Sequence, residues 1–444
     1  MENSAEIEAR DPEIYGYIAK EAERQENNLE MIPSENFTSR AVMQAMGSVL
    51  TNKYSEGYPG HRYYGGNQFI DKIESVAIDR AKKLFGVAHA NVQPYSGSPA
   101  NFEVYLAVCN PGDTIMGQNL PDGGHLTHGW KTSATGRIFK SIPYHVKADG
   151  FIDLDEVRSL ALEHKPKLIW VGSTAYTREF PFEEFSEIAE ESGAYLAADI
   201  SHISGLVIGG VHKSPKDYAH IITTTTHKTL RGPRGALIMV THKGIEKDSL
   251  LPEKIDKAVF PGMQGGPHDH TTAAIAVALQ EASTPEFAQY SMQIVRNSRA
   301  LASALMSNGI KLVTNGTDNH MILIDMTPFG NGSGVFGQEA LECAGITANK
   351  NTIPAEPSSP FFPTGIRLGT PAITTRGMKE KEMEAIAEII IEALEEVRGY
   401  SLPSDKVERA QYLGKFKEAL GTNAKLRELR KKSEEMCSAF PLYR

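Results

Sequence analysis

Apolar and polar segments alternate through the middle of the chain, from about residue 68 to residue 245. Apolar residues have helical spacing in segments 69–86, 153–165 and 182–193. Short apolar runs between and after them predict strands at 113–118, 166–173, 194–201, 220–227 and 235–241. Apolar strands that alternate with helices indicate a mostly parallel α/β sheet that helices cover on both faces. In such a sheet, ligands bind beyond the carboxyl ends of the strands.

The pattern changes on both sides of this region. Residues 11–30 combine helical spacing with many charges, which is typical of an arm that packs on another surface such as a second subunit. Segment 261–270 predicts a loop, and beyond residue 310 an α+β pattern follows, with a strand at 320–326 and an amphipathic helix at 380–397. We therefore predict an N-terminal helical arm (1–48), a large α/β domain (49–277) and a smaller α+β C-terminal domain (278–444).

Composition narrows the class of protein. The chain has 444 residues, 41% of them hydrophobic and 23% charged, and a net charge of -9, which argues against a nucleic-acid or anionic-membrane binder. The three cysteines are far apart, so we expect neither a disulfide framework nor a zinc site, and we expect no metal. The N-terminal segment does not resemble a signal peptide, and no apolar run is long enough to span a bilayer. We expect a cytoplasmic protein.

Residues that can perform chemistry gather at the predicted strand ends. The stretch "TTTTHKTLRGPRG" (223–235) delivers Lys228 to a glycine-rich turn, and "AADISH" places Asp199 after an earlier strand. In "PYSGSPAN" (94–101), Pro99 is expected to open a helix with Ser98 near its N-cap, and such a helix start binds phosphate.

A phosphate pocket, an aspartate and a lysine in this order suggest pyridoxal phosphate, with Lys228 forming the Schiff base and Asp199 keeping the pyridine nitrogen protonated. Each feature alone has a simpler explanation: a solvated lysine, a capping aspartate, an ordinary helix start. Together they favour the cofactor.

A second motif competes with this interpretation. "GSGVFG" (332–337) matches the glycine pattern of dinucleotide-binding proteins, and Glu356 follows it at the sequence spacing typical of a residue that contacts the ribose. However, "TPFGNGSG" separates the motif from the preceding strand, and Glu356 does not follow a clear strand. We expect a flexible loop here. The less favoured hypothesis is a NAD-dependent oxidoreductase.

Long stretches of the chain resemble serine hydroxymethyltransferases. These are "SENFTS" (34–39), "LTNKYSEGYPGHRYYGG" (50–66), "GGHLTHG" (123–129), "HKTLRGPRG" (227–235) and "GIRLGTPAITTRG" (365–377). The resemblance implies an aspartate-aminotransferase-like, fold-type I pyridoxal phosphate enzyme. It also implies reversible transfer of the serine hydroxymethyl carbon to tetrahydrofolate, giving glycine and methylenetetrahydrofolate through an external aldimine. An obligate homodimer with shared active sites, or a tetramer, is expected.

The resemblance assigns residues to the cofactor and to the chemistry. Lys228 matches the Schiff-base lysine, Asp199 the partner of the pyridine nitrogen, His125 the histidine stacked on the ring, and His202 the donor to the ring oxygen. The remaining cofactor positions are Ser96, Gly97, Ser98, Thr174, His227 and, from the neighbouring subunit, Gly265 and Gly266. Catalytic positions are Lys228, Glu56, His125, Tyr54, Tyr64 and Thr226.

Other matched positions face the substrates serine or glycine and a reduced pterin. Arg367 corresponds to the arginine that binds the amino-acid carboxylate, a bidentate task suited to a guanidinium, and Ser34 assists it. Tyr54, Glu56 and Tyr64 surround the serine hydroxyl, with Tyr54 and Glu56 lent by the other subunit. Leu120, Gly124, Leu126 and Asn351 correspond to positions around the pterin and its aromatic linker.

The chain departs from the family pattern at Tyr95, Pro99, Thr174, Ser201 and Met263. Trp130, directly after "GGHLTHG", is expected either in the core or at the pterin pocket. A modified pterin such as a methanopterin therefore stays open as co-substrate. A folate-independent aldolase acting on 3-hydroxy amino acids is the alternative function, and a non-catalytic binding protein is a further one.

Overall fold

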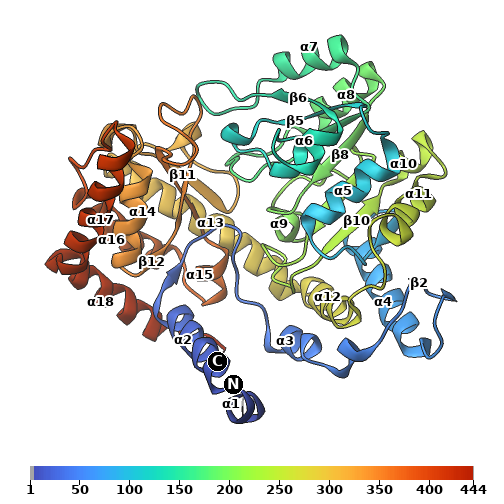
Figure 1. Cartoon of the computed structure of the whole chain (residues 1–444), viewed down its shortest axis with the longest axis horizontal. Helices are drawn as coiled ribbons and strands as arrows, with labels where there is room; N and C mark the ends of the chain where they lie inside the picture. Colours follow the sequence, from blue (N-terminus) through green and yellow to red (C-terminus); the bar gives the residue numbers. More distant parts are fainter. Residues whose placement is uncertain (1–4, 444) are drawn as a thin grey trace.

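The computed structural model describes residues 5–443, and its largest element is a seven-stranded sheet with the order β4-β10-β9-β8-β7-β5-β6 (Figure 1). Neighbouring strands from β5 to β9 pair in parallel, whereas β10 is antiparallel to both β9 and β4. The predicted mostly parallel sheet is thus confirmed. The strands are β4 (His89–Asn91), β5 (Thr114–Gln118), β6 (Lys140–Tyr144), β7 (Leu168–Val171), β8 (Tyr195–Asp199), β9 (Ile221–Thr225) and β10 (Ala236–Val240).

Helices cover both faces of this sheet because its strands are apolar on both sides. In β7, Leu168 and Trp170 belong to the apolar cluster on the face of α5 and α11, while Ile169 and Val171 belong to the cluster on the other face, with α4, α7, α8 and α12. All four side chains are fully buried, and each such burial contributes ~2 kcal/mol to folding. The helices are α4 (Gln68–Phe85), α5 (Gly97–Val108), α6 (Ala134–Ile138), α7 (Leu154–His164), α8 (Phe182–Ser192), α9 (Ser204–Ile208), α10 (His242–Lys247), α11 (Leu251–Lys257) and α12 (Asp269–Ala282).

A second apolar core lies around a three-stranded antiparallel sheet, β11-β14-β13, nearer the C-terminus. Helix α13 (Pro285–Ser307) joins the two cores, since Phe287 and Ile294 pack in the first and Leu301 and Leu305 in the second. The domain boundaries given above stay a prediction. The other elements are β11 (Met321–Asp325), α14 (Gly334–Cys343), β12 (Ile346–Thr347), β13 (Asn349–Asn351), β14 (Gly365–Gly369), α15 (Pro371–Thr375), α16 (Glu380–Glu395), α17 (Lys406–Thr422) and α18 (Ala424–Ala439).

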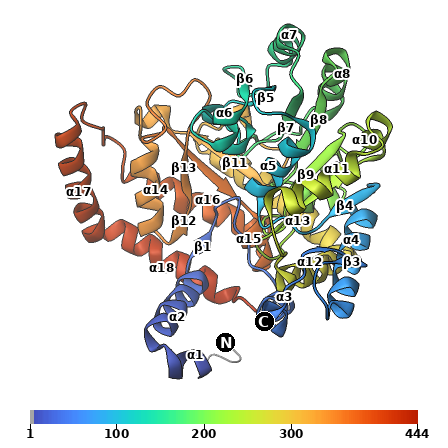
Figure 2. The same cartoon turned by 45° about the vertical axis from the view of Figure 1, so that its right-hand side comes forward.

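Residues 12–30 of the N-terminal arm lie beside the second core, whereas residues 40–46 pack against α12, and residues 1–4 of the predicted arm fall outside the described residues. Its longest helix begins where Asp11 accepts a hydrogen bond from the amide of Ile14, with Pro12 in the first turn. After it, β1 pairs with β12. Figure 2 shows α2 beside α18, with α1 at the far end of α2. The arm contains α1 (Ala5–Arg10), α2 (Pro12–Asn27), β1 (Leu29–Glu30) and α3 (Arg40–Met46), and the hairpin β2 (Gly57–Tyr58) and β3 (His61–Arg62) follows.

Two loop predictions were wrong in part. The "GSGVFG" motif is not a flexible loop, because α14 begins inside it at Gly334, where a Cβ would collide with the carbonyl oxygen of Gly365. The glycine thus permits close packing of a helix on a strand. The Glu356 carboxylate accepts hydrogen bonds from the amides of Ile353 and Thr364, so it organises its own loop, which removes the support for a ribose contact.

The second loop, 261–270, starts within a helical turn, Ala258–Met263, and ends in α12.

Within residues 5–443, no helix is both long and apolar enough to cross a bilayer.

Candidate active site

The phosphate-binding helix start predicted in "PYSGSPAN" is present, but it begins two residues earlier than expected. Ser96 is the N-cap of α5 and Gly97 its first residue, so Ser98 lies inside the helix and is exposed. Proline is tolerated throughout the first helical turn, so Pro99 did not mark its beginning. A Cβ at Gly97 would lie 2.7 Å from Thr225 Cγ2, which shows how closely the helix start approaches β9. Gly97 also lines the pocket described next, and the amides of a first helical turn lack partners within the helix.

Lys228 lies three residues after the end of β9, in a pocket lined by residues at or just after the ends of β7, β8 and β9. Its backbone carbonyl accepts a hydrogen bond from Asn36 Nδ2 at 2.9 Å, which fixes the turn. Burial lowers the pKa of the Lys228 amine to about 8, against the opposing effect of Asp199. A nucleophilic neutral amine is therefore accessible near neutral pH. The pocket is lined by Gly97, His125, His128, Ser173, Thr174, Asp199, Ser201, His202, Thr225 and Lys228.

Asp199 ends β8 and is held by three donors. Oδ2 accepts a hydrogen bond from Asn101 Nδ2 at 2.8 Å and lies 3.2 Å from His128 Nε2, and Oδ1 accepts one from the amide of Ser201 at 3.0 Å. Burial opposes ionisation, but the contact with His128 and the neighbouring positive groups hold the pKa of Asp199 well below its usual range. The pocket therefore contains a fixed negative charge.

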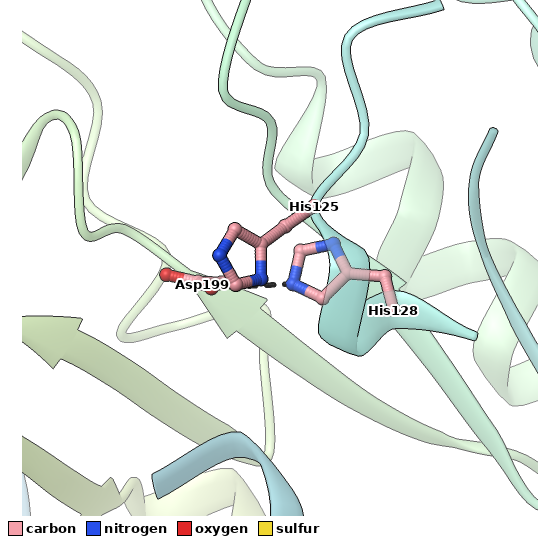
Figure 3. Close-up of side chains that lie close together, drawn as sticks. All are labelled: His125, His128 and Asp199. Atoms are coloured by element: carbon pink, nitrogen blue, oxygen red, sulfur yellow. Dashed lines mark hydrogen bonds and ion pairs between the residues drawn. The ribbon is translucent and has the colours of Figure 1, made fainter. Parts of the chain in front are cut away.

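His125, His128 and Asp199 form a close group, shown in Figure 3. Their ligand atoms lie within 4.8 Å of one another, a separation at which they could hold a metal ion. All three residues already have protein partners, because His125 Nδ1 lies 2.7 Å from Thr127 Oγ1 and His128 contacts Asp199. Burial lowers the pKa of His125 to about 4, so its ring is neutral. The helix start and Lys228 beside this group indicate an organic phosphate rather than a metal.

The second core contributes a guanidinium to the edge of the pocket. Arg367, in β14, donates from Nη1 to the carbonyl oxygen of Thr174 and from Nε to Asn349 Oδ1 at 3.2 Å. Among the described residues, none accepts a hydrogen bond from its Nη2. Burial lowers the pKa of Arg367 to about 10, so it remains charged at neutral pH. A partly desolvated guanidinium with a free donor is suited to a carboxylate.

Comparison with known proteins agrees with this chemistry. The family model of serine hydroxymethyltransferase matches residues 7–390. A serine hydroxymethyltransferase of Acidothermus cellulolyticus is 58% identical over 387 residues, covering 86% of this chain and 88% of the relative. One of Sorangium cellulosum is 58% identical, covering 85% and 88%, and one of Desulfotalea psychrophila is 55% identical, covering 85% and 87%. The chain belongs to the serine hydroxymethyltransferase family.

Membership confirms the resemblance and the fold class, and it makes the chain a pyridoxal phosphate-dependent glycine hydroxymethyltransferase with tetrahydrofolate as co-substrate. The residues present fit the cofactor. The α5 start, which packs so closely on Thr225 that position 97 has no room for a Cβ, suits the phosphate, Lys228 suits the aldehyde and the Asp199 carboxylate suits the ring nitrogen. The roles of the individual residues stay predictions.

Two residues that contact the Asp199 carboxylate, His128 and Asn101, were not predicted from the sequence. His128 stacks on Trp170 with ring centroids 5.0 Å apart and an interplanar angle of 8°, which fixes its Nε2 toward Asp199. Asn101 is held from behind, because its Oδ1 accepts a hydrogen bond from Thr223 Oγ1 at 2.8 Å. The only signal for His128 was its position within "GGHLTHG"; nothing in the local sequence pointed to Asn101.

A second cluster of predicted residues lies apart from the residues that line the Lys228 pocket. The rings of Tyr54 and Tyr64 meet edge to face at 5.0 Å, and the Glu56 carboxylate raises the pKa of Tyr54. Gly265 and Gly266 lie against Glu56 and Tyr54. Tyr95, one of the departures from the family, donates from its hydroxyl to the carbonyl oxygen of Gly266 at 2.7 Å. These groups form one unit that the Lys228 pocket of the same chain does not include.

Only two of the four predicted pterin positions line the same cavity. Leu120 and Asn351 line a cavity of about 240 Å³ together with Trp130, Thr174 and Lys350. Gly124 and Leu126 do not line this cavity, although Thr174 Oγ1 donates to the carbonyl oxygen of Gly124 at 3.1 Å. Trp130 thus belongs to the pocket wall.

The remaining predicted positions lie outside the Lys228 pocket. Ser34 and His227 line a larger cavity of about 530 Å³ below the arm, where Arg234 Nη1 is 3.4 Å from His227 Nε2. The Thr226 hydroxyl donates to the carbonyl oxygen of Pro233 at 2.6 Å, which ties down the glycine-rich turn. The catalytic role of Thr226 stays a prediction.

Proposed function

We propose that the chain interconverts serine and glycine at the Lys228 pocket, passing the hydroxymethyl carbon to and from tetrahydrofolate. The observation that carries this proposal is that Lys228, Asp199 and the start of α5 line one pocket, and that Arg367 contacts Thr174 in its wall. When bound, pyridoxal phosphate supplies a protonated ring that accepts electrons from the amino acid's Cα.

The environments of Lys228, Asp199 and Arg367 suggest a separate role for each side chain. Lys228 presents a neutral amine to the cofactor's aldehyde because its pKa is about 8. Asp199, kept ionised, holds a proton on the ring nitrogen. Arg367 orients the amino-acid carboxylate through the donor that the protein leaves free, and its other nitrogens are fixed by Thr174 and Asn349.

The hydroxymethyl group needs a proton acceptor, and Glu56 is the proposed one. We propose a homodimer in which Tyr54, Glu56 and Tyr64, with Gly265 and Gly266, complete the partner's pocket. This is supported by their shared cluster and by the exposure of Tyr54 and Tyr64. A tetramer built from two such dimers stays open, and the cytoplasmic location stays a prediction from the sequence.

Subunit mixing tests the shared site. Glu56→Gln and Lys228→Ala should each abolish serine cleavage, whereas refolding a mixture of the two should restore about a quarter of wild-type activity, because half of the dimers regain one complete site. A mixture that stays inactive, although its subunits exchange, would contradict the shared site.

The activity itself is tested by serine cleavage with and without tetrahydrofolate. The purified protein should be yellow, and borohydride should fix the colour on Lys228. We expect strong stimulation by tetrahydrofolate. If no reduced pterin, including methanopterins, stimulates the reaction, the folate-independent aldolase replaces the proposed function.

A further inference from the structure

Two buried imidazoles, His202 and His320, face each other where the two cores meet. His202 follows β8 and lines the Lys228 pocket, and His320 directly precedes β11 of the smaller sheet. His202 Nδ1 lies 3.3 Å from His320 Nε2, and the rings are nearly parallel at an angle of 24°. The side chains are 5% and 0% exposed, so water does not compete for this contact.

Both rings are neutral, which limits the protons available to the pair. Burial, together with Lys228 and Arg367, holds the pKa of His202 well below its usual range, and burial with Arg367 and Lys228 lowers the pKa of His320 to about 3. A neutral imidazole has one N–H donor and one acceptor nitrogen. The contact therefore exists in only two forms, in which either His202 Nδ1 or His320 Nε2 donates.

The far nitrogen of His320 decides between these two forms. His320 Nδ1 is buried and has no hydrogen-bond partner among the described residues. If His202 donated, the proton of His320 would lie on Nδ1 as a buried N–H without an acceptor, which proteins rarely tolerate. If His320 donates from Nε2, only a lone pair is left unpaired there. The second form is favoured, and it leaves His202 with its proton on Nε2.

We propose that His320 is a positioning residue that fixes the tautomer of His202, so that His202 Nε2–H serves as a donor to the ring oxygen of the cofactor. This inference rests on the proposed function, because it requires pyridoxal phosphate in the Lys228 pocket. It assigns the smaller core a second task beside that of Arg367: it sets the donor pattern of a side chain that belongs to the sheet of the larger core.

Two substitutions separate positioning from packing. In His320→Gln, the side-chain amide can place a donor where His320 Nε2 stood, whereas His320→Leu keeps the volume and removes the donor. We expect the dissociation constant of pyridoxal phosphate to rise ~10-fold in the leucine variant, the effect of losing one hydrogen bond, and to stay within about threefold of wild type in the glutamine variant. His220→Leu is the control, since His220 is also buried but lies at the opposite end of β9.

Imidazole nitrogen NMR of the holoenzyme reads the tautomer directly. We expect the His202 proton on Nε2 in the wild type and a mixture of tautomers in His320→Leu. A proton on His202 Nδ1 in the wild type would overturn the proposal, even if the leucine variant does not fold. Equal cofactor affinity in the wild type and His320→Leu, or equal weakening in both variants, would overturn it too. A wild-type protein that binds no pyridoxal phosphate would instead refute the proposed function.

Discussion

The low pKa of Lys228 predicts how the protein takes up its cofactor. Only the neutral amine attacks an aldehyde, so the rate of uptake follows the neutral fraction of Lys228. With a pKa of about 8, roughly 9% of this amine is neutral at pH 7. An ordinary lysine with a pKa near 10.5 would be only ~0.03% neutral. Burial therefore accelerates uptake at pH 7 by ~300-fold.

The assay follows pyridoxal phosphate binding to the cofactor-free protein by stopped-flow absorbance, at pH values from about 7 to about 10. Rates measured with Nα-acetyl-lysine correct for ionisation of the cofactor itself. The corrected rate should rise with pH, bend near pH 8 and become constant above it. Arg367→Met should move the bend to higher pH, because Arg367 lowers the pKa of Lys228. Arg158→Met, on the surface of α7, should leave it unchanged.

A corrected rate that still climbs tenfold per pH unit between pH 8 and pH 10 would refute this reasoning. It would show that Lys228 titrates like an exposed lysine and that burial does not activate it.

Four further substitutions have defined outcomes. Lys228→Met should raise the free energy of unfolding of the cofactor-free protein by ~2–3 kcal/mol at pH 7, as measured by urea titration. The reason is that folding lowers the pKa of Lys228 from 10.5 to about 8, which costs stability below pH 8. The gain in the methionine variant should disappear as pH rises from 8 to 10.5. Neither carboxylate oxygen of Glu103 has a partner within the described residues, and burial raises the pKa of Glu103 to about 8. The wild type should therefore lose stability as pH rises from 4.5 through 8. Thermal unfolding at both ends of that range should show no such loss in Glu103→Leu. Gly97→Ala should weaken cofactor binding at least ~10-fold in equilibrium titrations, since the new methyl group would press on Thr225. Trp130→Ala should raise the KM for tetrahydrofolate ~10-fold and leave folate-free cleavage of 3-hydroxy amino acids unchanged, because Trp130 lines the 240 Å³ cavity and not the Lys228 pocket.

The fold could be predicted because each strand of the large sheet has its own apolar signal. In β7, consecutive apolar residues serve two faces at once, and the sequence shows this as an unbroken run. The ends of such strands define the site, so Lys228 and Asp199 were found from their positions after β9 and β8. Helix α5 was placed two residues late because proline is compatible with several positions of the first turn.

Other residues could not be predicted because their roles depend on contacts between distant elements. Asn101 points at Asp199 only because α5 packs across the sheet at β9 and β10, and His320 meets His202 only because β11 begins near the large sheet. Glycines gave a false signal in "GSGVFG" for a related reason. Close packing of a helix on a strand and close approach to a phosphate both exclude a Cβ, and the sequence alone does not distinguish them.

Two contacts beside the Lys228 pocket join the smaller core to the larger one. Arg367 and His320 belong to the smaller core, whereas Thr174 and His202, which they contact, belong to the larger one. Both contacts cross the same interface, so a rigid-body shift of one core against the other would change both. With the roles proposed above, a bound amino-acid carboxylate that held Arg367 in place would also favour the proposed donor tautomer of His202.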